Sequence, residues 1–256
     1  MKIRHRLALG IVSSLLTIFQ ADAQGSAGTD AAIESRYIID YPTAGLIGHG
    51  SVAADFEFFE ANGMLARVSL GAWDRLLLGI SFGGSNIVGT GQPTWNKAPG
   101  IELRLRVIEE NLVLPAMAIG FSSQGKETFI SAMDRYTIKS PGLYAVASKN
   151  YQAMGFLSFH GGINYSMEHS DNDEDINLFG GVEKTLGPFA SITAEYDLSM
   201  NDSNSGALGK GRGYLNFGLR CAVGNGLALG IVLKDVLRNQ QDASLGNRVV
   251  QLEYVR

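Results

Sequence analysis

The stretch IELRLRVI, residues 101–108, decides the fold class of this chain of 256 residues. Apolar and charged side chains alternate along it with a period of two, which is typical of a β-strand whose two faces meet different surroundings. One face carries Ile101, Leu103, Leu105 and Val107, and the other carries Glu102, Arg104 and Arg106. Residues 51–59 and 190–199 repeat the pattern. We therefore expect a sheet with one apolar face and one charged face.

About twelve such segments follow one another along the chain. Each is long enough to cross a bilayer as a tilted strand, which takes about 9–11 residues. They are residues 50–59, 63–73, 75–86, 100–109, 111–122, 142–150, 154–168, 174–185, 189–199, 210–221, 226–236 and 246–256. The pattern predicts an all-β fold, an up-and-down antiparallel transmembrane β-barrel of about 12 strands.

The connections between these segments alternate in length. Tight connections lie near residues 73–74, 110–111, 151–153, 186–188 and 224–225, and longer ones at 85–100, 122–141, 169–175, 201–210 and 237–246. Bacterial outer-membrane barrels have short periplasmic turns and long outer loops, so both termini are expected in the periplasm. The first connection, near residues 60–62, is the exception because it is short. Residues 127–135 could form a short helix inside a loop.

The N-terminus predicts secretion. Lys2, Arg4 and Arg6 precede an apolar run at residues 7–19, and the A-x-A sequence at 21–23 supplies a cleavage site, as in a signal peptide. We expect a signal peptide at 1–23, then a periplasmic leader at 24–49 that could also form a mouth or plug segment, and an outer-membrane β-barrel at 50–256. The predicted location is the bacterial cell outer membrane.

Composition excludes several classes of protein. One cysteine rules out an intramolecular disulfide scaffold and a four-cysteine zinc site. The formal net charge of -4 gives no bulk attraction to nucleic acid. A secreted soluble β-sandwich would alternate in the same way but with its apolar face inward. The long strands, the charges of both signs on the polar face and the loop pattern favour the membrane barrel.

A membrane barrel of this kind turns its charged face inward, because a cation at the bilayer midplane costs about 2–4 kcal/mol. Twelve strands are fewer than the 16–18 of wide porins, so we expect a narrow or plugged passage. The predicted lumen-lining residues are Asp55, Glu57, Arg67, Arg75, Glu102, Arg104, Arg106, His160, Asn164, Glu183, Glu195, Asp197, Arg212, Asn216, Arg220 and Glu253.

Two patterns in the chain suggest other chemistry but fit it poorly. Ser158, His160 and Asn164 share one strand face and could form a nucleophile, yet that face is expected to be luminal, where a lipid ester has little access. The acidic residues 171, 173 and 175 alternate as calcium ligands can, but the glycine and the final glutamate of an EF-hand loop are missing. We expect no catalytic residues, no metal and no cofactor; the acidic segment is expected to be a solvated outer loop.

Three stretches resemble the YjbH family of bacterial outer-membrane barrel proteins. They are DYPTAGLIGHG at 40–50, PGIELRLRVIEENLVLPAMAIGF at 99–121 and SPGLYAVASKNY at 140–151. The chain departs from that family in having room for one barrel only, and in ending on Tyr254, Val255 and Arg256. The resemblance implies a link with exopolysaccharide production and export. It also implies that residues 42–44 fold into or across the barrel mouth, although an ordinary linker fits them equally.

The expected function is a non-enzymatic small channel or accessory barrel, with exopolysaccharide export as the role that the resemblance implies. One alternative is a plugged structural barrel that displays its loops, and a less favoured one is a lipid hydrolase using Ser158 and His160. The expected partners are outer-membrane lipid and lipopolysaccharide, with polysaccharide or its export machinery as further candidates.

Overall fold

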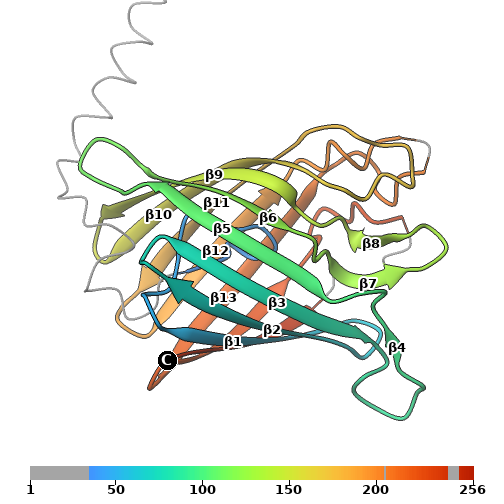
Figure 1. Cartoon of the computed structure of the whole chain (residues 1–256), viewed down its shortest axis with the longest axis horizontal. Coiled ribbons are helices and arrows are strands. Elements are labelled where there is room, and N and C mark those ends of the chain that lie inside the picture. Colours follow the sequence, from blue (N-terminus) through green and yellow to red (C-terminus); the bar gives the residue numbers. More distant parts are fainter. Residues whose placement is uncertain (1–34, 205, 242–247) are drawn as a thin grey trace, which may run out of the picture.

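The computed structural model describes residues 35–204, 206–241 and 248–256, and in these ranges the chain forms a closed β-barrel (Figure 1). The predicted signal peptide lies outside the described residues, as do residues 24–34 of the leader. The barrel strands are β1 (Val52–Phe59), β2 (Gly63–Ala72), β3 (Leu76–Ser85), β5 (Gly100–Ile108), β6 (Ala116–Ser122), β9 (Gly142–Gln152), β10 (Phe156–Tyr165), β11 (Asn177–Leu186), β12 (Ala190–Asp197), β13 (Tyr214–Gly224), β14 (Leu227–Leu233) and β15 (Arg248–Val255).

Each barrel strand pairs antiparallel with its neighbours in chain order, and β1 also pairs with β15 to close the sheet. Asp55 on β1 lies opposite Arg67 on β2 and opposite Glu253 on β15. The predicted fold, an up-and-down antiparallel transmembrane barrel of twelve strands, is therefore confirmed.

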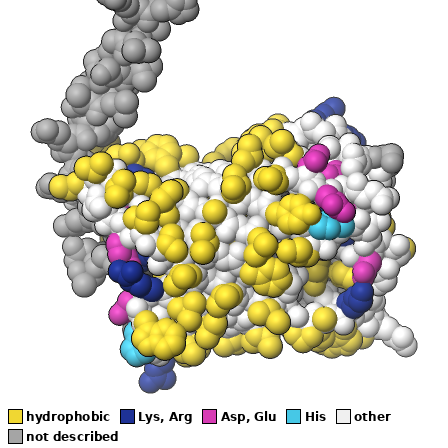
Figure 2. Space-filling view, turned by 45° about the horizontal axis from the view of Figure 1, so that its top comes forward, with side chains coloured by type: hydrophobic (Ala, Val, Ile, Leu, Met, Phe, Trp, Pro, Cys, Tyr) yellow, Lys and Arg dark blue, Asp and Glu magenta, His cyan; other side chains and the backbone are white. Residues whose placement is uncertain are grey.

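The apolar face points outward. Phe56, Leu103 and Ile192 are 38%, 44% and 46% exposed, whereas Arg104 and Glu195 are buried inside the barrel. Figure 2 shows apolar side chains over the middle of the visible face, with charged side chains near its two ends. A soluble sandwich would bury the apolar set instead, so that alternative is excluded.

The two ends of the barrel differ. We call the end with the connections after β2, β5, β9, β11 and β13 the turn end, and the opposite end the loop end. The loop after β3 adds the short strand β4 (Thr94–Trp95), and the loop after β6 forms a hairpin of β7 (Lys126–Ile130) and β8 (Arg135–Ile138). The helix predicted at 127–135 is therefore wrong. The connection after β5 is also longer than predicted, since residues 109–115 lie outside the strands.

The short connection after β1 is a tight hairpin turn. Ala61 and Asn62 both have positive φ, 57° and 52°, the backbone that suits the twist of two paired strands. Among the described residues, no helix is long and apolar enough to cross a membrane.

Residues 36–47, which we call the hairpin plug, lie inside the barrel (blue in Figure 1). Both ends of this segment lie at the turn end. Ser35 accepts a hydrogen bond from Arg220, whose strand position is next to the β11–β12 turn. At the other end, the N–H of His49 donates to Asp74 in the β2–β3 turn, at 2.7 Å. The segment thus enters the barrel, reverses and leaves through the same opening.

Candidate functional site

The hairpin plug reverses direction through its own backbone. The N–H of Ile38 donates to the carbonyl of Tyr41 at 2.8 Å, and the N–H of Thr43 donates to the carbonyl of Arg36 at 3.1 Å. Pro42 lies directly opposite Tyr37 in this short antiparallel pairing. These bonds leave the N–H groups at the tip free to face the barrel wall.

The tip of the plug is held by a single carboxylate. Glu195 on β12 accepts hydrogen bonds from the N–H groups of Ile39, Asp40 and Tyr41 at 2.9–3.2 Å. The Asp40 carboxylate in turn faces the ammonium of Lys234 at 3.0 Å. All five residues are buried, and charge-assisted hydrogen bonds of this kind are about twice as strong as neutral ones.

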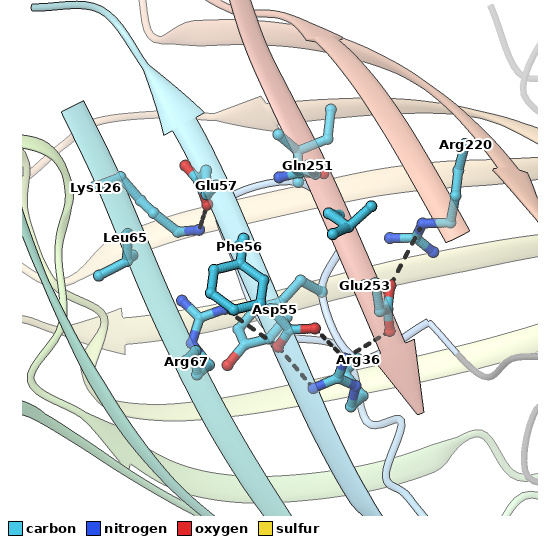
Figure 3. Close-up of a pocket in the computed structure, with 13 residues that line it drawn as sticks. Arg36, Asp55, Phe56, Glu57, Leu65, Arg67, Lys126, Arg220, Gln251 and Glu253 are labelled. Atoms are coloured by element: carbon cyan, nitrogen blue, oxygen red, sulfur yellow. Dashed lines mark hydrogen bonds and ion pairs between the residues drawn. The ribbon is translucent and has the colours of Figure 1, made fainter. Parts of the chain in front are cut away.

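The base of the plug neutralises two acidic residues at the β1–β15 pairing, where the barrel closes. Asp55 and Glu253 lie opposite each other on β1 and β15, an arrangement of like charges that destabilises a sheet. Arg36 inserts between them. Its guanidinium donates to both Asp55 oxygens at 2.6 and 2.9 Å and to Glu253 at 2.6 Å (Figure 3).

Two arginines of β5 bind the plug through its carbonyl groups. Arg104 Nη1 donates to the carbonyls of Arg36 and Gly45, both at 2.7 Å, and Arg106 Nε donates to the carbonyl of Ala44 at 3.0 Å. The wall therefore satisfies both N–H and C=O groups of a chain segment that lies away from water, as buried backbone requires.

Tyr37 occupies a cage of cations. Arg67, Arg104 and Lys126 lie over its ring at 4.4, 5.1 and 5.6 Å from the ring centroid. Its hydroxyl donates to Glu102. Cations at this distance from an aromatic face are attracted by the ring quadrupole, the more strongly where water is excluded.

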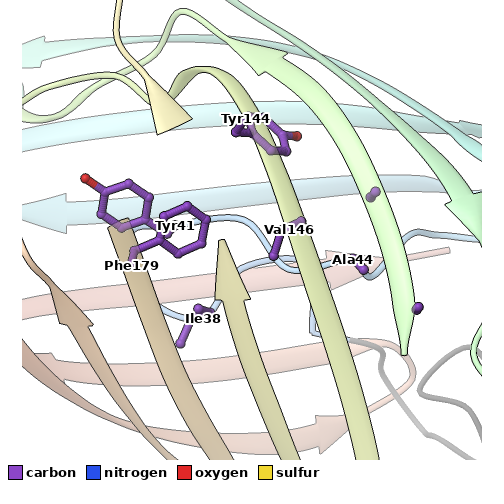
Figure 4. Packing of buried hydrophobic residues seen from close by; sticks show 8 residues of the cluster. Ile38, Tyr41, Ala44, Tyr144, Val146 and Phe179 are labelled. Atoms are coloured by element: carbon purple, nitrogen blue, oxygen red, sulfur yellow. The ribbon is translucent and has the colours of Figure 1, made fainter. Parts of the chain in front are cut away.

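Apolar contacts complete the seat of the plug. Tyr41 stacks on Phe179 of β11, with ring centroids 4.4 Å apart (Figure 4). A side chain at Gly181 would meet the Ile38 methyl group at 2.5 Å, so the glycine leaves room for the plug. Each of the three apolar clusters in the interior contains plug residues: Ile38, Tyr41 and Ala44 in the first, Ile39 in the second, and Leu46 and Ile47 in the third.

The hairpin of β7 and β8 forms a second layer of closure toward the loop end. Lys126 pairs with Glu57 on β1 at 2.7 Å, and Glu127 pairs with Lys234 at 2.9 Å. Because Lys234 also pairs with Asp40, one wall ammonium holds the tip of the plug and this inner loop together.

Two hollows adjoin the plug. A cavity of about 40 Å³ lies beside its base among Arg36, Arg67, Lys126 and Arg220 (Figure 3). It is large enough for a few water molecules. A larger hollow of about 440 Å³ opens at the turn end, between Ser35 and the β11–β12 turn.

The structure places most of the predicted luminal side chains in the interior. These are Asp55, Glu57, Arg67, Glu102, Arg104, Arg106, His160, Asn164, Glu183, Glu195, Asp197, Asn216, Arg220 and Glu253. Arg75 and Arg212 are corrections. Arg75 lies in the β2–β3 turn with its side chain 59% exposed, and Arg212 lies exposed in the loop before β13. Both positions flank a strand, where the alternation that assigns a face no longer applies.

Several buried charges around the plug escape the barrel-strand pattern. Arg36 and Asp40 belong to the plug, Lys126 to the inner loop, and Lys234 follows the end of β14. The charge periodicity of the barrel strands cannot identify residues outside those strands. The one available signal was the pair Arg36 and Asp40 within an otherwise apolar and aromatic segment.

The serine and histidine predicted as an alternative nucleophile do not meet. Ser158 donates to Asn150, while His160 Nδ1 lies 2.8 Å from the hydroxyl of Ser148. The third member, Asn164, donates to the carbonyl of Pro141 at 3.0 Å. The predicted trio is therefore not assembled, and Ser148 already accepts a hydrogen bond from the N–H of Ala44 in the plug.

The acidic outer loop is solvated only in part. Asp175 is exposed, as expected, whereas Asp171 and Asp173 are buried. Asp171 pairs with Arg135 at 2.5 Å and with Lys139 at 2.8 Å. Burial alone would raise the pKa of Asp171, but the hydrogen bond and charge of Lys139, together with Arg135, hold it below its ordinary value. Within the described ranges, no group of three or more His, Cys, Asp or Glu could hold a metal ion.

Comparison with known proteins finds likeness in structure only. No family model matches the chain, and no curated protein matches it. The solved "KdgM porin in complex with disordered oligogalacturonate" matches with a TM-score of 0.50 at 12% identity, over 80% of this chain and 98% of that one. "NanC porin" matches with a TM-score of 0.44 at 9% identity, over 80% and 98%. The COG4313 outer membrane channel from Pseudomonas putida F1 gives 0.39 at 12% identity, over 83% and 96%. The likeness shows the barrel fold and no more.

Proposed function

We propose that this protein is a gated channel of the bacterial outer membrane, closed at rest by its own hairpin plug. In this proposal the turn end faces the periplasm and the outward apolar face meets lipid, with lipopolysaccharide beside the loop end. The barrel opens when the plug withdraws, and the charged wall behind it then lines a narrow, hydrated passage.

The path of the plug carries the proposal. Residues 36–47 enter and leave through the turn end, so the hairpin can withdraw as a unit without any part of the chain passing through the barrel. A segment that crossed from one end to the other would have to be unthreaded. Eight strands already give an interior that side chains alone can fill, whereas twelve enclose more space. Here that space contains a retractable segment.

The cargo class is part of the proposal. The resemblance to YjbH-like barrels and the dense hydrogen-bonding groups of the wall both fit a polysaccharide, whose hydroxyls can replace the backbone groups of the plug on Glu195, Arg104 and Arg106. One similar structure, the KdgM porin, holds an oligogalacturonate by its own description. Export of exopolysaccharide is the direction that the resemblance favours.

Conductance in planar bilayers tests the gate. Glu195→Ala removes the acceptor of three buried N–H groups, each of which costs about 1–3 kcal/mol when left unpaired. We expect the open probability to rise at least tenfold over the intact chain, since about 1.4 kcal/mol is a factor of ten.

The matched control is Glu183→Ala. Glu183 is also a luminal carboxylate, but it bonds Ser191 and Arg220 on the wall. Its removal is expected to leave the open probability close to that of the intact chain. A Glu195→Ala barrel that is folded and stays electrically silent would contradict the channel.

A second candidate is a permanently plugged barrel that anchors and displays its loops. The apolar contacts favour it, because plug residues take part in all three interior clusters and stack on Phe179. Silence of both variants in the bilayer, with normal folding, is the result that this candidate predicts.

A further inference from the structure

The wall of the barrel recognises seven backbone groups of the plug. Glu195 accepts from three consecutive N–H groups, and Ser148 accepts from the N–H of Ala44 at 2.9 Å. Arg104 and Arg106 donate to three carbonyls. These groups occur in any polypeptide, so the wall provides a general seat for a peptide backbone in a reversed, hairpin-like conformation.

Side chains add selectivity to this seat. A basic residue, Arg36, lies between Asp55 and Glu253, and an acidic residue four positions later, Asp40, faces Lys234. An aromatic residue follows each of these charges. Tyr37 fills the cage of cations, and Tyr41 stacks on Phe179 while its hydroxyl donates to Asp197 at 3.0 Å.

We propose that the interior of this barrel is a binding site for a linear peptide that is not covalently joined to it. The ligand has a basic and an aromatic residue followed, after two positions, by an acidic and an aromatic residue, the order of residues 36–41. The site is built from buried, oppositely charged wall residues and reads the peptide backbone through the groups above. The inference rests on the proposed function only in requiring that the plug can leave.

The connection between plug and barrel allows the covalent link to be cut after folding. Gly48, His49 and Gly50 are exposed at the turn end, immediately before β1. A protease recognition sequence inserted after His49 therefore lies outside the barrel. The full chain folds with its plug in place, and cleavage then leaves the plug held by noncovalent contacts alone. The uncut protein with the same insertion is the control.

The first measurement is whether the cleaved fragment stays with the barrel during gel filtration in detergent. Retention supports the proposal, because no covalent bond then holds the fragment. If the fragment is lost, a fluorescent synthetic peptide of residues 35–48 is added, and its anisotropy is followed as the barrel is titrated. Saturable binding supports the proposal, and loss of the fragment without any rebinding overturns it.

Charge exchange tests the selectivity. The Asp40→Lys peptide is expected to bind at least about tenfold more weakly than the native peptide, because it places two cations together in a buried site. A Lys234→Asp barrel is expected to recover that peptide. A scrambled peptide of the same composition that binds as well as the native one would overturn the proposal, and this arm needs no altered barrel.

Two further measurements distinguish the peptide site from a glycan site and from the gated channel. If an acidic oligosaccharide binds the cleaved barrel and the peptide does not, the interior is a glycan site and the peptide proposal fails. Conductance of the cleaved barrel, measured in parallel, tests the gate by itself. A barrel that binds the peptide but never conducts refutes the channel and supports the peptide site.

Discussion

Arg104 shows how a single residue joins the wall to the plug. Its guanidinium is fully buried and donates to Glu102 at 2.6 Å, to the hydroxyl of Tyr144 at 3.1 Å and to the carbonyls of Arg36 and Gly45. The planar group suits this role because it presents several donors in fixed directions. A lysine in its place would offer a single ammonium.

We expect Arg104→Met to destabilise the barrel by about 3–5 kcal/mol, because it leaves the buried Glu102 carboxylate without the guanidinium that hydrogen-bonds it. Urea unfolding in lipid vesicles measures the change. The double variant Arg104→Met with Glu102→Gln is expected to regain part of the loss. Arg75→Met, at an exposed turn position, is the control and should be neutral; equal losses at both arginines would contradict the argument.

The β7–β8 hairpin gives a prediction at the scale of one element. Its residue Arg135 pairs with Asp171, whose pKa is lowered in the folded protein. A lowered pKa means that ionised Asp171 stabilises the fold at pH values above its unfolded pKa. That contribution falls as the pH drops through the folded value, when the carboxylate takes up a proton.

Limited proteolysis of the loop at residues 123–141 measures this effect. We expect cleavage to accelerate as the pH falls below about 4, the ordinary pKa of an aspartate, with an acid-active protease used throughout. The Asp171→Asn variant should be cleaved faster at neutral pH and respond less to acid. A steep acid response that persists in Asp171→Asn would assign it to another group.

How far each element could be predicted depends on what holds it in place. The barrel strands were predictable because lipid outside and charge inside impose a period of two, as at Leu103 and Arg104. The β7–β8 hairpin was not, since the spacing of Phe129, Ile130 and Met133 also suits one turn of helix. In the structure Phe129 packs edge-on against Tyr136, a tertiary contact that local pattern does not encode.

The plug was foreseen only as one of two options, because its conformation is set by residues far away in the chain. Arg36 bonds Glu253, 217 positions later, and the N–H of Asp40 bonds Glu195, 155 positions later. No periodicity within residues 36–47 reports such partners. The wall of the candidate site can therefore be predicted from strand alternation. The conformation of the plug that occupies it cannot.

For the whole molecule, the outward apolar face makes the cost of a charged substitution depend on how deep in the bilayer the substituted residue lies. Ile80 lies in the middle of β3 and points outward beside Val68 and Ile101, whereas Ile176 is exposed in the loop before β11. Ile80→Arg is expected to cost about 2–4 kcal/mol and Ile176→Arg about 0–1 kcal/mol. Urea unfolding in vesicles compares the two. Equal costs would mean that the lipid-facing band does not lie where the strands place it.

The position of Arg36 has a consequence for assembly. Its two carboxylate partners stand on the first and last strands, so its full set of ion pairs exists only in a barrel whose circumference is complete. Closure itself brings the two acids face to face, and Arg36 offsets their repulsion. Binding of the plug and closure of the barrel are thus thermodynamically linked. The plug, which is synthesised before all the barrel strands, is fully bound only when the last strand has paired with the first.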